Sequence, residues 1–161
     1  MMDIPQPGHP TSSTCGDAAS ASSLAPFRAL VIEDDEITSR LLELTLSRRC
    51  GATGRTADCA TDAIAQINGP HAFDIVFVDV GLPDANGLDE LRHSHLAHPE
   101  AHHIVVTSRD DEETLVAAAA AGADDYLLKP VRFMTLLLAL EHALTVDTFP
   151  DDEITRPEAA V

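Results

Sequence analysis

Lysine is almost absent from this sequence. Lys129 is the only lysine in 161 residues, and the other basic positions are arginines. Acidic residues number 27 against 10 Lys and Arg, which gives a formal net charge of −17. A surface that binds nucleic acid needs clustered Lys and Arg, and an anionic membrane surface attracts the same residues. The sequence therefore argues against nucleic acid and against membranes as partners.

Other residue types and sequence features that are rare or absent exclude further classes of function. The chain has no Trp and one Tyr, which disfavours stacking on bases. No apolar run reaches the roughly 18 residues of a membrane span, and the first residues do not form a secretory signal. The three cysteines fit no ligand spacing and favour a reduced setting. We expect a cytoplasmic protein.

The length fits one domain with tails. Residues 1–25 are rich in Ser, Pro, Gly and Ala without apolar periodicity, and we predict that they are disordered. Residues 147–161 are polar, acidic and interrupted by two prolines, which is typical of a flexible tail or the start of a linker. The folded domain is predicted over residues 26–146.

Short apolar runs alternate with helical patterns in this domain. Five runs predict strands at about 29–32, 52–57, 73–78, 104–106 and 126–128. The apolar spacing predicts helices over about 37–50, 63–67, 88–91, 114–121 and 131–146, with Gly51 and Gly122 as expected helix stops. Such alternation predicts a parallel sheet covered on both faces, that is, a doubly wound α/β domain with five strands and five helices.

Reactive side chains follow four of the five predicted strands. These strand ends carry Glu33-Asp34-Asp35, Asp79, Thr107-Ser108 and Lys129. In this fold class, ligands bind outside the carboxyl ends of the strands, so we expect these side chains to meet. Crowded carboxylates repel each other unless a cation lies among them, and oxygen ligands suit Mg²⁺. Mg²⁺, a hydroxyl and an ammonium around one carboxylate are what phosphoryl transfer to that carboxylate requires.

The motifs LVIEDD, FDIVFVDVGLPDANG, IVVTS and DDYLLKP together resemble the receiver domain of two-component response regulators, over residues 27–146. The resemblance implies a flavodoxin-like fold with strand order 2-1-3-4-5. It implies that Asp79, at the start of D-x-x-x-P-x-x-N-G, accepts a phosphoryl group. Asp79, Thr107 and Lys129 would be the catalytic residues. A histidine kinase or histidine phosphotransfer protein would be the donor, and a downstream protein would be the target.

The resemblance also implies a Mg²⁺ site. Asp34 would bind the ion directly, and Glu33 would act through water. Asp35 would lie one step past the site, although a slip of one residue would exchange these roles. Asp79 and the backbone carbonyl of Gly81 would complete the protein ligands.

The remaining roles follow from the same resemblance. The Thr107 hydroxyl would move to meet the phosphoryl group, and Tyr126 would swing inward in response. Lys129 would pair first with Asp79 and then with the phosphate, and the peptide bond after Lys129 would be cis. Val80 and Ser108 would join Thr107 and Lys129 as phosphate-binding positions.

Three alternatives stay open at this point. The chain could be the receiver fragment of a longer regulator that lacks its output domain here. A hydrolase with an aspartyl-phosphate intermediate would need a second acid two residues after the nucleophile, where Gly81 stands. A flavodoxin-like cofactor binder would need a Ser-, Thr- and Gly-rich loop after the first strand, where acids stand. We therefore predict a phosphoacceptor signalling domain, with only self-catalysed phosphotransfer and dephosphorylation, rather than an enzyme.

Five histidines lie close together in the sequence, at positions 93, 95, 98, 102 and 103. Their spacing is poor for a metal site, because residues two apart face different sides of a helix. We interpret this segment as a solvated loop and helix end.

The last predicted helix carries leucines at 136, 137, 138, 140 and 144, more apolar surface than one face of a sheet needs. Burial alone would account for them. With the face around Tyr126, part of this surface would also suit a protein partner or a homodimer.

Overall fold

The computed structural model describes residues 26–145 of the chain. Five parallel strands pair in the order β2-β1-β3-β4-β5. The strands are β1 (Arg28–Ile32), β2 (Thr53–Ala57), β3 (Ile75–Asp79), β4 (His102–Thr107) and β5 (Asp125–Leu128). The helices are α1 (Glu36–Cys50), α2 (Ala60–Ile67), α3 (Gly87–Ala97), α4 (Glu112–Ala121) and α5 (Phe133–Thr145). The predicted doubly wound fold and its strand order are confirmed, while the predicted tails lie outside the described residues.

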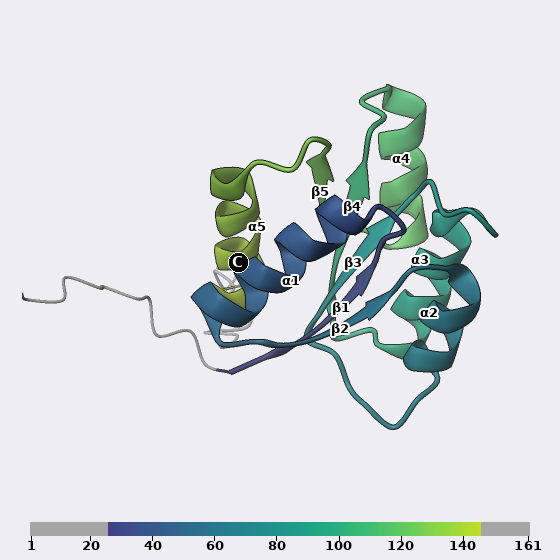
Figure 1. Cartoon of the computed structure of the whole chain (residues 1–161). Coiled ribbons are helices and arrows are strands. Elements are labelled where there is room, and N and C mark those ends of the chain that lie inside the picture. Colours follow the sequence, from purple (N-terminus) through teal and green to yellow (C-terminus); the bar gives the residue numbers. More distant parts are fainter. Residues whose placement is uncertain (1–25, 146–161) are drawn as a thin grey trace, which may run out of the picture.

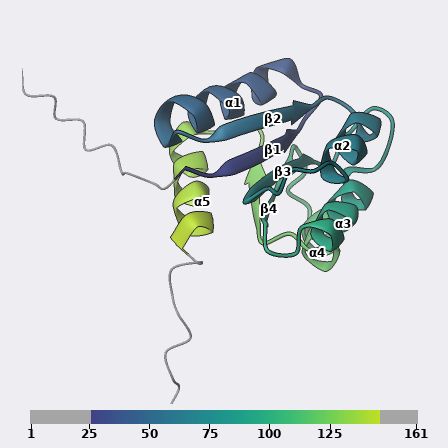
Figure 2. The same cartoon turned by 90° about the horizontal axis from the view of Figure 1, so that it is seen from below.

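The sheet is the middle layer of three. Helices α1 and α5 cover one face, and α2, α3 and α4 cover the other (Figures 1 and 2). Successive residues of a strand point to opposite faces. Ile75 and Phe77 of β3 therefore pack in the core under α1 and α5. Val76 and Val78 enter the core under α2 and α3. A strand buried on both faces must be apolar throughout, which is why β3 was readable as a continuous run.

The helices begin and end where local chemistry dictates. The side chains of Asp35 and Asp111 cap α1 and α4 by accepting hydrogen bonds from the N–H groups of Thr38 and Thr114, three residues later. Gly51 ends α1 at φ 64°, in the left-handed region that favours glycine. Gly122 ends α4 at φ 106°, so both predicted stops are confirmed.

Several predicted details are corrected by the structure. The third helix extends over Gly87–Ala97, α4 begins at Glu112, and α5 begins at Phe133 rather than at 131. Ile37 lies on the outer side of α1 with 81% of its surface exposed, whereas Leu42 and Leu46 are buried. The helical spacing at 37, 41 and 44 therefore marks a partly exposed side of α1.

The interpretation of the five histidines as a solvated loop and helix end is correct for His95 and His98, which lie at the end of α3, and wrong for the last two. His102 and His103 belong to strand β4, and His103 is fully buried. Its ring Nε2 lies 3.0 Å from the Ser94 hydroxyl on α3. The sequence pattern was misleading because a β-strand that contains two histidines lacks the continuous apolar run that marks its neighbours.

Among residues 26–145, no helix combines the length and the apolar character needed to cross a membrane.

Candidate functional site

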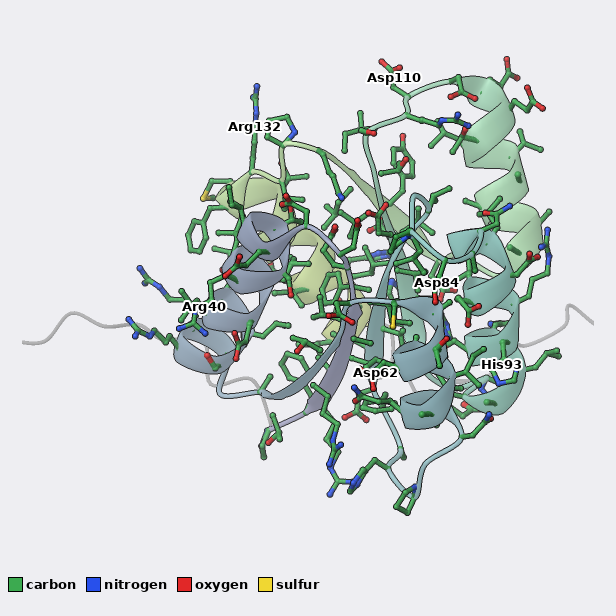
Figure 3. The ribbon with its side chains drawn as sticks, turned by 45° about the vertical axis from the view of Figure 1, so that its right-hand side comes forward. Arg40, Asp62, Asp84, His93, Asp110 and Arg132 are labelled. Atoms are coloured by element: carbon green, nitrogen blue, oxygen red, sulfur yellow. The ribbon has the colours of Figure 1, made fainter. Side chains whose placement is uncertain are left out.

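The four reactive strand ends meet at the carboxyl edge of the sheet. The register pairs Ile32 with Val78 and Asp79 with Val106, so β1, β3 and β4 end side by side, with β5 next to β4. The loops that follow β4 and β5 lie at this edge in Figure 1, and Asp110 and Arg132 project from them in Figure 3. The parallel topology therefore gathers residues from distant parts of the sequence into one site.

Lys129 lies at the centre of this site. Its Nζ donates to Glu33 Oε1 at 2.7 Å and to Asp79 Oδ2 at 2.8 Å. The side chains of Glu33 and Asp79 are only 1% and 8% exposed, while that of Lys129 is 19% exposed. Two carboxylates removed from water need such a partner, because their mutual repulsion is otherwise uncompensated. The single lysine of the chain thus supplies the counter-charge of the site.

Asp79 is held in place from both sides. Lys129 donates to Oδ2, and the backbone N–H of Gly81 donates to Oδ1 at 2.8 Å. Burial raises the pKa of the Asp79 carboxyl, but the hydrogen bonds from Lys129 and Gly81 outweigh it, so its pKa lies below the ordinary value. Asp79 is therefore an ionised, oriented carboxylate at neutral pH, which is the state a nucleophile needs.

Glu33 and Lys129 respond to the same environment in opposite ways. Burial raises the pKa of Glu33 to about 7, although the hydrogen bond from Lys129 opposes the rise. Burial lowers the pKa of Lys129, but its hydrogen bonds to Asp79 and Glu33 reverse the effect, and its pKa lies above the ordinary value. The Lys129 ammonium is therefore permanently charged, whereas Glu33 resists ionisation because its negative neighbour and its burial both act against it.

An acidic cluster lies beside the lysine. Glu33, Asp34 and Asp79 each offer a carboxylate oxygen, and these oxygens lie within 4.8 Å of one another. Glu33 Oε2 is buried and has no hydrogen-bond partner in the described structure. Asp35, by contrast, accepts from Thr38 N–H at 2.7 Å as the cap of α1. Asp34 therefore belongs to the acidic cluster, whereas the Asp35 carboxylate caps the helix.

The cluster fits a hard divalent cation. Its donors are all oxygens, the kind that Mg²⁺ takes, and an unpartnered buried carboxylate oxygen is costly without a positive charge or a donor near it.

Thr107 and the residues after it form the other wall of the site. Thr107 is 2% exposed, and its hydroxyl accepts the backbone N–H of Arg109 at 3.0 Å. The carbonyl of Thr107 also accepts Lys129 N–H at 2.8 Å. Ser108 and Arg109 are exposed beside a pocket of about 480 Å³. The pocket is lined by Asp79, Val80, Gly81, Ala85, Asn86, Thr107, Ser108, Arg109 and Lys129.

The loop after β3 is shaped by Asn86 and Gly87. Asn86 caps α3 through Leu88 N–H, and Gly87 N–H donates to the Val80 carbonyl at 3.1 Å. A Cβ on Gly87 would lie 1.9 Å from the backbone oxygen of Asp79. Only glycine lets the start of α3 pack this closely against the backbone of Asp79.

Of the other predicted positions, Val80 directly follows β3 and Tyr126 lies on β5. Val80 is half-buried, and its N–H points to the Val106 carbonyl at 3.4 Å. Tyr126 is 48% exposed on β5. The Lys129–Pro130 peptide bond is cis, as expected.

Sequence reasoning missed a role for Asp84 in the loop after β3. The Asp84 carboxylate accepts from Ala60 N–H at 2.8 Å and from Thr61 at 3.3 Å. Cys59, at the N-cap of α2, makes no side-chain cap hydrogen bond. Asp84 therefore caps α2 from a distant loop, and Figure 3 shows it beside that helix. A cap that lies 24 residues away from the helix start leaves no spacing pattern in the sequence. The one local signal is that Asp84 directly follows Pro83, which indicates a constrained loop.

Comparison with known proteins identifies the family. The profile described as "Response regulator receiver domain" matches residues 29–141, most of the chain. This chain is a receiver domain of two-component response regulators. Curated relatives of the receiver domain include the cell cycle transcriptional regulator CtrA of Caulobacter vibrioides, 32% identical over 65% of this chain and 44% of CtrA. Another is the transcriptional regulatory protein PmrA of Pectobacterium parmentieri, 37% identical over 65% of this chain and 46% of PmrA.

Solved structures give the same answer. A CheY-like receiver domain protein from Methanospirillum hungatei matches with a TM-score of 0.70 and 29% identity, over 76% of this chain and 96% of that one. A response regulator from Burkholderia pseudomallei, solved with a phosphorylated aspartic acid, calcium ion and citrate, matches with a TM-score of 0.66 and 32% identity, over 75% and 71% of the two chains. The receiver domain spans less than half the length of the curated relatives CtrA and PmrA. Receiver domains are signalling domains that work with histidine kinases and phosphotransfer proteins.

Proposed function

We propose that this receiver domain accepts a phosphoryl group on Asp79. The observation that carries the proposal is the Glu33–Lys129–Asp79 arrangement, in which one buried carboxylate is ionised, oriented by two donors and open to a pocket. A carboxylate in this state is a nucleophile for phosphorus, and the surrounding donors stabilise the charge that develops on the phosphoryl oxygens. The Burkholderia relative, solved with a phosphorylated aspartic acid, supports the proposal by similarity.

The chemistry balances with a phosphohistidine donor. A carboxylate oxygen of Asp79 attacks phosphorus, an acyl-phosphate P–O bond forms, and the P–N bond of the donor breaks. The departing imidazole of the kinase or phosphotransfer protein takes up a proton. The Lys129 ammonium pairs with the transferred phosphoryl group, and the Thr107 hydroxyl donates a hydrogen bond to the same group. The backbone N–H groups of Val80 and Ser108 complete the phosphate-binding set.

We propose Mg²⁺ as the cofactor. Glu33, Asp34, Asp79 and the Gly81 carbonyl would hold it, and the partnerless Glu33 Oε2 and the all-oxygen donor set support this choice. When bound, the ion neutralises charge on the carboxylates and on the phosphoryl oxygens.

The response to phosphorylation is proposed to run from Thr107 to Tyr126. Thr107 lies at the end of β4, and Tyr126 lies on the neighbouring strand with about half of its surface exposed. If the Thr107 hydroxyl turns toward the phosphoryl group, it leaves the Arg109 N–H, and the freed space favours an inward Tyr126. Such a change biases a two-state equilibrium and alters the surface that a partner meets.

The surface for a downstream protein is proposed on β5 and α5. Exposed apolar side chains gather on these two elements, at Tyr126, Leu128, Phe133, Met134 and Leu138. A homodimer through this face is the alternative occupant. We place the protein in the cytoplasm, in keeping with Cys50 and Cys59 as free thiols.

Two versions of the whole protein fit this domain. In the first, the receiver domain works on its own, without an attached output domain. In the second, the receiver belongs to a longer regulator, as its curated relatives, which are more than twice as long as the matched region, would suggest. An aspartyl-phosphate hydrolase is disfavoured, because Gly81 offers no second acid beside Asp79.

Intact mass spectrometry tests the proposal. The wild-type chain, incubated with MgCl₂ and a small phosphodonor such as acetyl phosphate, is expected to gain the mass of one phosphoryl group. The gain should disappear in Asp79→Asn and when EDTA replaces MgCl₂. Asp110→Asn, an exposed acid on the neighbouring loop (Figure 3), is the matched control and should behave as wild type. No gain in the wild type, or an equal gain in Asp79→Asn, would contradict the proposal.

A further inference from the structure

The two adjacent histidines of β4 point to opposite faces of the sheet. His103 faces α3, where its ring meets Ser94. His102 shares its face with Ile104 and Val106, which belong to the core under α5. His102 therefore lies on the α5 side, at the start of β4, far along the strand from Thr107.

Two more ligand-type side chains reach the same place from other elements. Asp125, at the start of β5, shares its face with Leu127, which packs in the core under α5. His142 lies in the last turn of α5, next to the buried Ala143. We call His102, Asp125 and His142 the His-Asp-His cluster. In Figure 1 the yellow end of α5 lies away from the loops after β4 and β5. The cluster therefore lies at the amino ends of the strands, whereas Asp79 lies at a carboxyl end.

The geometry of the cluster is close to that of a coordination site. Each of the three residues offers one ligand atom, and all three atoms lie within 4.8 Å of one another. His142 Nδ1 lies 3.7 Å from Asp125 Oδ2. The imidazole rings of His102 and His142 meet edge to face, with centroids 5.6 Å apart. In a tetrahedral zinc site with bonds of about 2.0–2.1 Å, neighbouring ligand atoms are about 3.3 Å apart, so a small rotation of side chains suffices.

The donor set selects the kind of metal. Two imidazole nitrogens and one carboxylate oxygen suit Zn²⁺ and neighbouring first-row transition metals, whereas Mg²⁺ prefers oxygen alone. Side-chain exposure decreases from 59% for His142 to 31% for Asp125, and His102 is half-buried. The site is therefore open on one side, with room for water as a fourth ligand. The acidic cluster at the other edge of the sheet holds no histidine, so the two sites differ in chemistry.

We propose that the His-Asp-His cluster binds a single Zn²⁺ ion. Each ligand comes from a different element, so the ion joins the last turn of α5 to the first residues of β4 and β5. Metal binding at this cluster thus secures the C-terminal end of α5 against the sheet. The proposal is independent of phosphorylation, because none of its residues contributes to the Asp79 site.

Isothermal titration calorimetry of the tag-free chain with ZnCl₂ tests this inference. The wild-type chain, freed of metal with EDTA and then exchanged into buffer with excess MgCl₂, is expected to bind one equivalent of Zn²⁺. Binding should weaken at least tenfold in His142→Ala and in Asp125→Ala. His71→Ala, which removes a half-buried histidine that contacts Arg55 on the far side of the fold, is the matched control and should bind as wild type. Asp34→Asn should also leave Zn²⁺ binding unchanged.

A second readout fixes the position of the ion. The imidazole signals of His142 in ¹H–¹⁵N NMR spectra should shift on addition of one equivalent of ZnCl₂, while those of His71 stay in place. Circular dichroism of His142→Ala without metal should match the wild type, because the His142 side chain is 59% exposed. The proposal is overturned if the wild-type chain binds no Zn²⁺, if His142→Ala binds it equally well, or if Asp34→Asn abolishes the binding.

Discussion

The buried histidine of β4 should make this domain sensitive to mild acid. His103 is 0% exposed, and burial is the main reason that its pKa falls from 6.5 to about 4. Asp124 opposes the fall, but its Oδ2 lies 3.9 Å from the His103 Nδ1 and its side chain is 44% exposed. In the unfolded chain the imidazole titrates at its ordinary pKa. Between these two values, the unfolded state binds the proton more readily than the folded state.

This difference in pKa fixes the direction and the size of the pH effect on the free energy of unfolding. The contribution of His103 is fully present above pH 6.5 and is lost as the pH falls from 6.5 toward 4, because protonation favours the unfolded chain. A shift of about 2.5 units corresponds to about 3 kcal/mol at its limit, at about 1.4 kcal/mol per unit. Between pH 7.5 and pH 5, the same linkage predicts a loss of about 2 kcal/mol.

Urea unfolding followed by circular dichroism measures this loss. The experiment compares the wild type with His103→Gln at pH 7.5 and pH 5, with EDTA present so that metal ions play no part. All other groups titrate in both proteins, so the wild type should lose about 2 kcal/mol more than His103→Gln between the two pH values. His93→Gln, which replaces a half-buried histidine of α3 that contacts Asn68, should keep the wild-type difference. An equal loss in the wild type and in His103→Gln would refute the reasoning.

Three further changes test the architecture of the site. Asp84→Ala should lower the melting temperature by a few degrees because α2 loses its cap, whereas Asp84→Asn, which keeps an acceptor, should recover most of the loss in thermal melts. Gly87→Ala should cost about 1–3 kcal/mol in urea unfolding and reduce phosphorylation, since its Cβ would collide with the Asp79 backbone; Gly54→Ala, with open space around it, should be nearly neutral. Lys129→Ala should keep the fold and Mg²⁺ binding, yet slow phosphoryl transfer by about a hundredfold, as measured by mass gain over time; a wild-type rate would contradict the role of Lys129.

The sequence predicted the site better than it predicted the details around it. Four residues end or directly follow strands, namely Glu33, Asp79, Thr107 and Lys129. Parallel strands end on one side of the sheet, so the meeting of these residues could be inferred from the sequence. The separate roles of the adjacent acids Asp34 and Asp35 could not be inferred in this way, because a hydrogen bond in the folded chain decides which of them caps α1.

The positions of the histidines could not be predicted from the sequence. His102 and His103 are neighbours in the sequence, yet the pleat of β4 sends one toward α5 and the other toward α3. A linear spacing rule for helices cannot separate them. Likewise, the cap that Asp84 gives to α2 depends on how a loop lies in space. Such contacts between distant residues follow from the fold and leave no local pattern.

Chemical trapping of the acyl phosphate tests the central claim most directly. Borohydride reduces an aspartyl phosphate to homoserine, so the chain is incubated with MgCl₂ and acetyl phosphate, reduced, digested and sequenced by mass spectrometry. The account predicts homoserine in place of Asp79 and an unchanged peptide when MgCl₂ is omitted. Homoserine at another aspartate, or an unmodified Asp79 in the complete reaction, would contradict it.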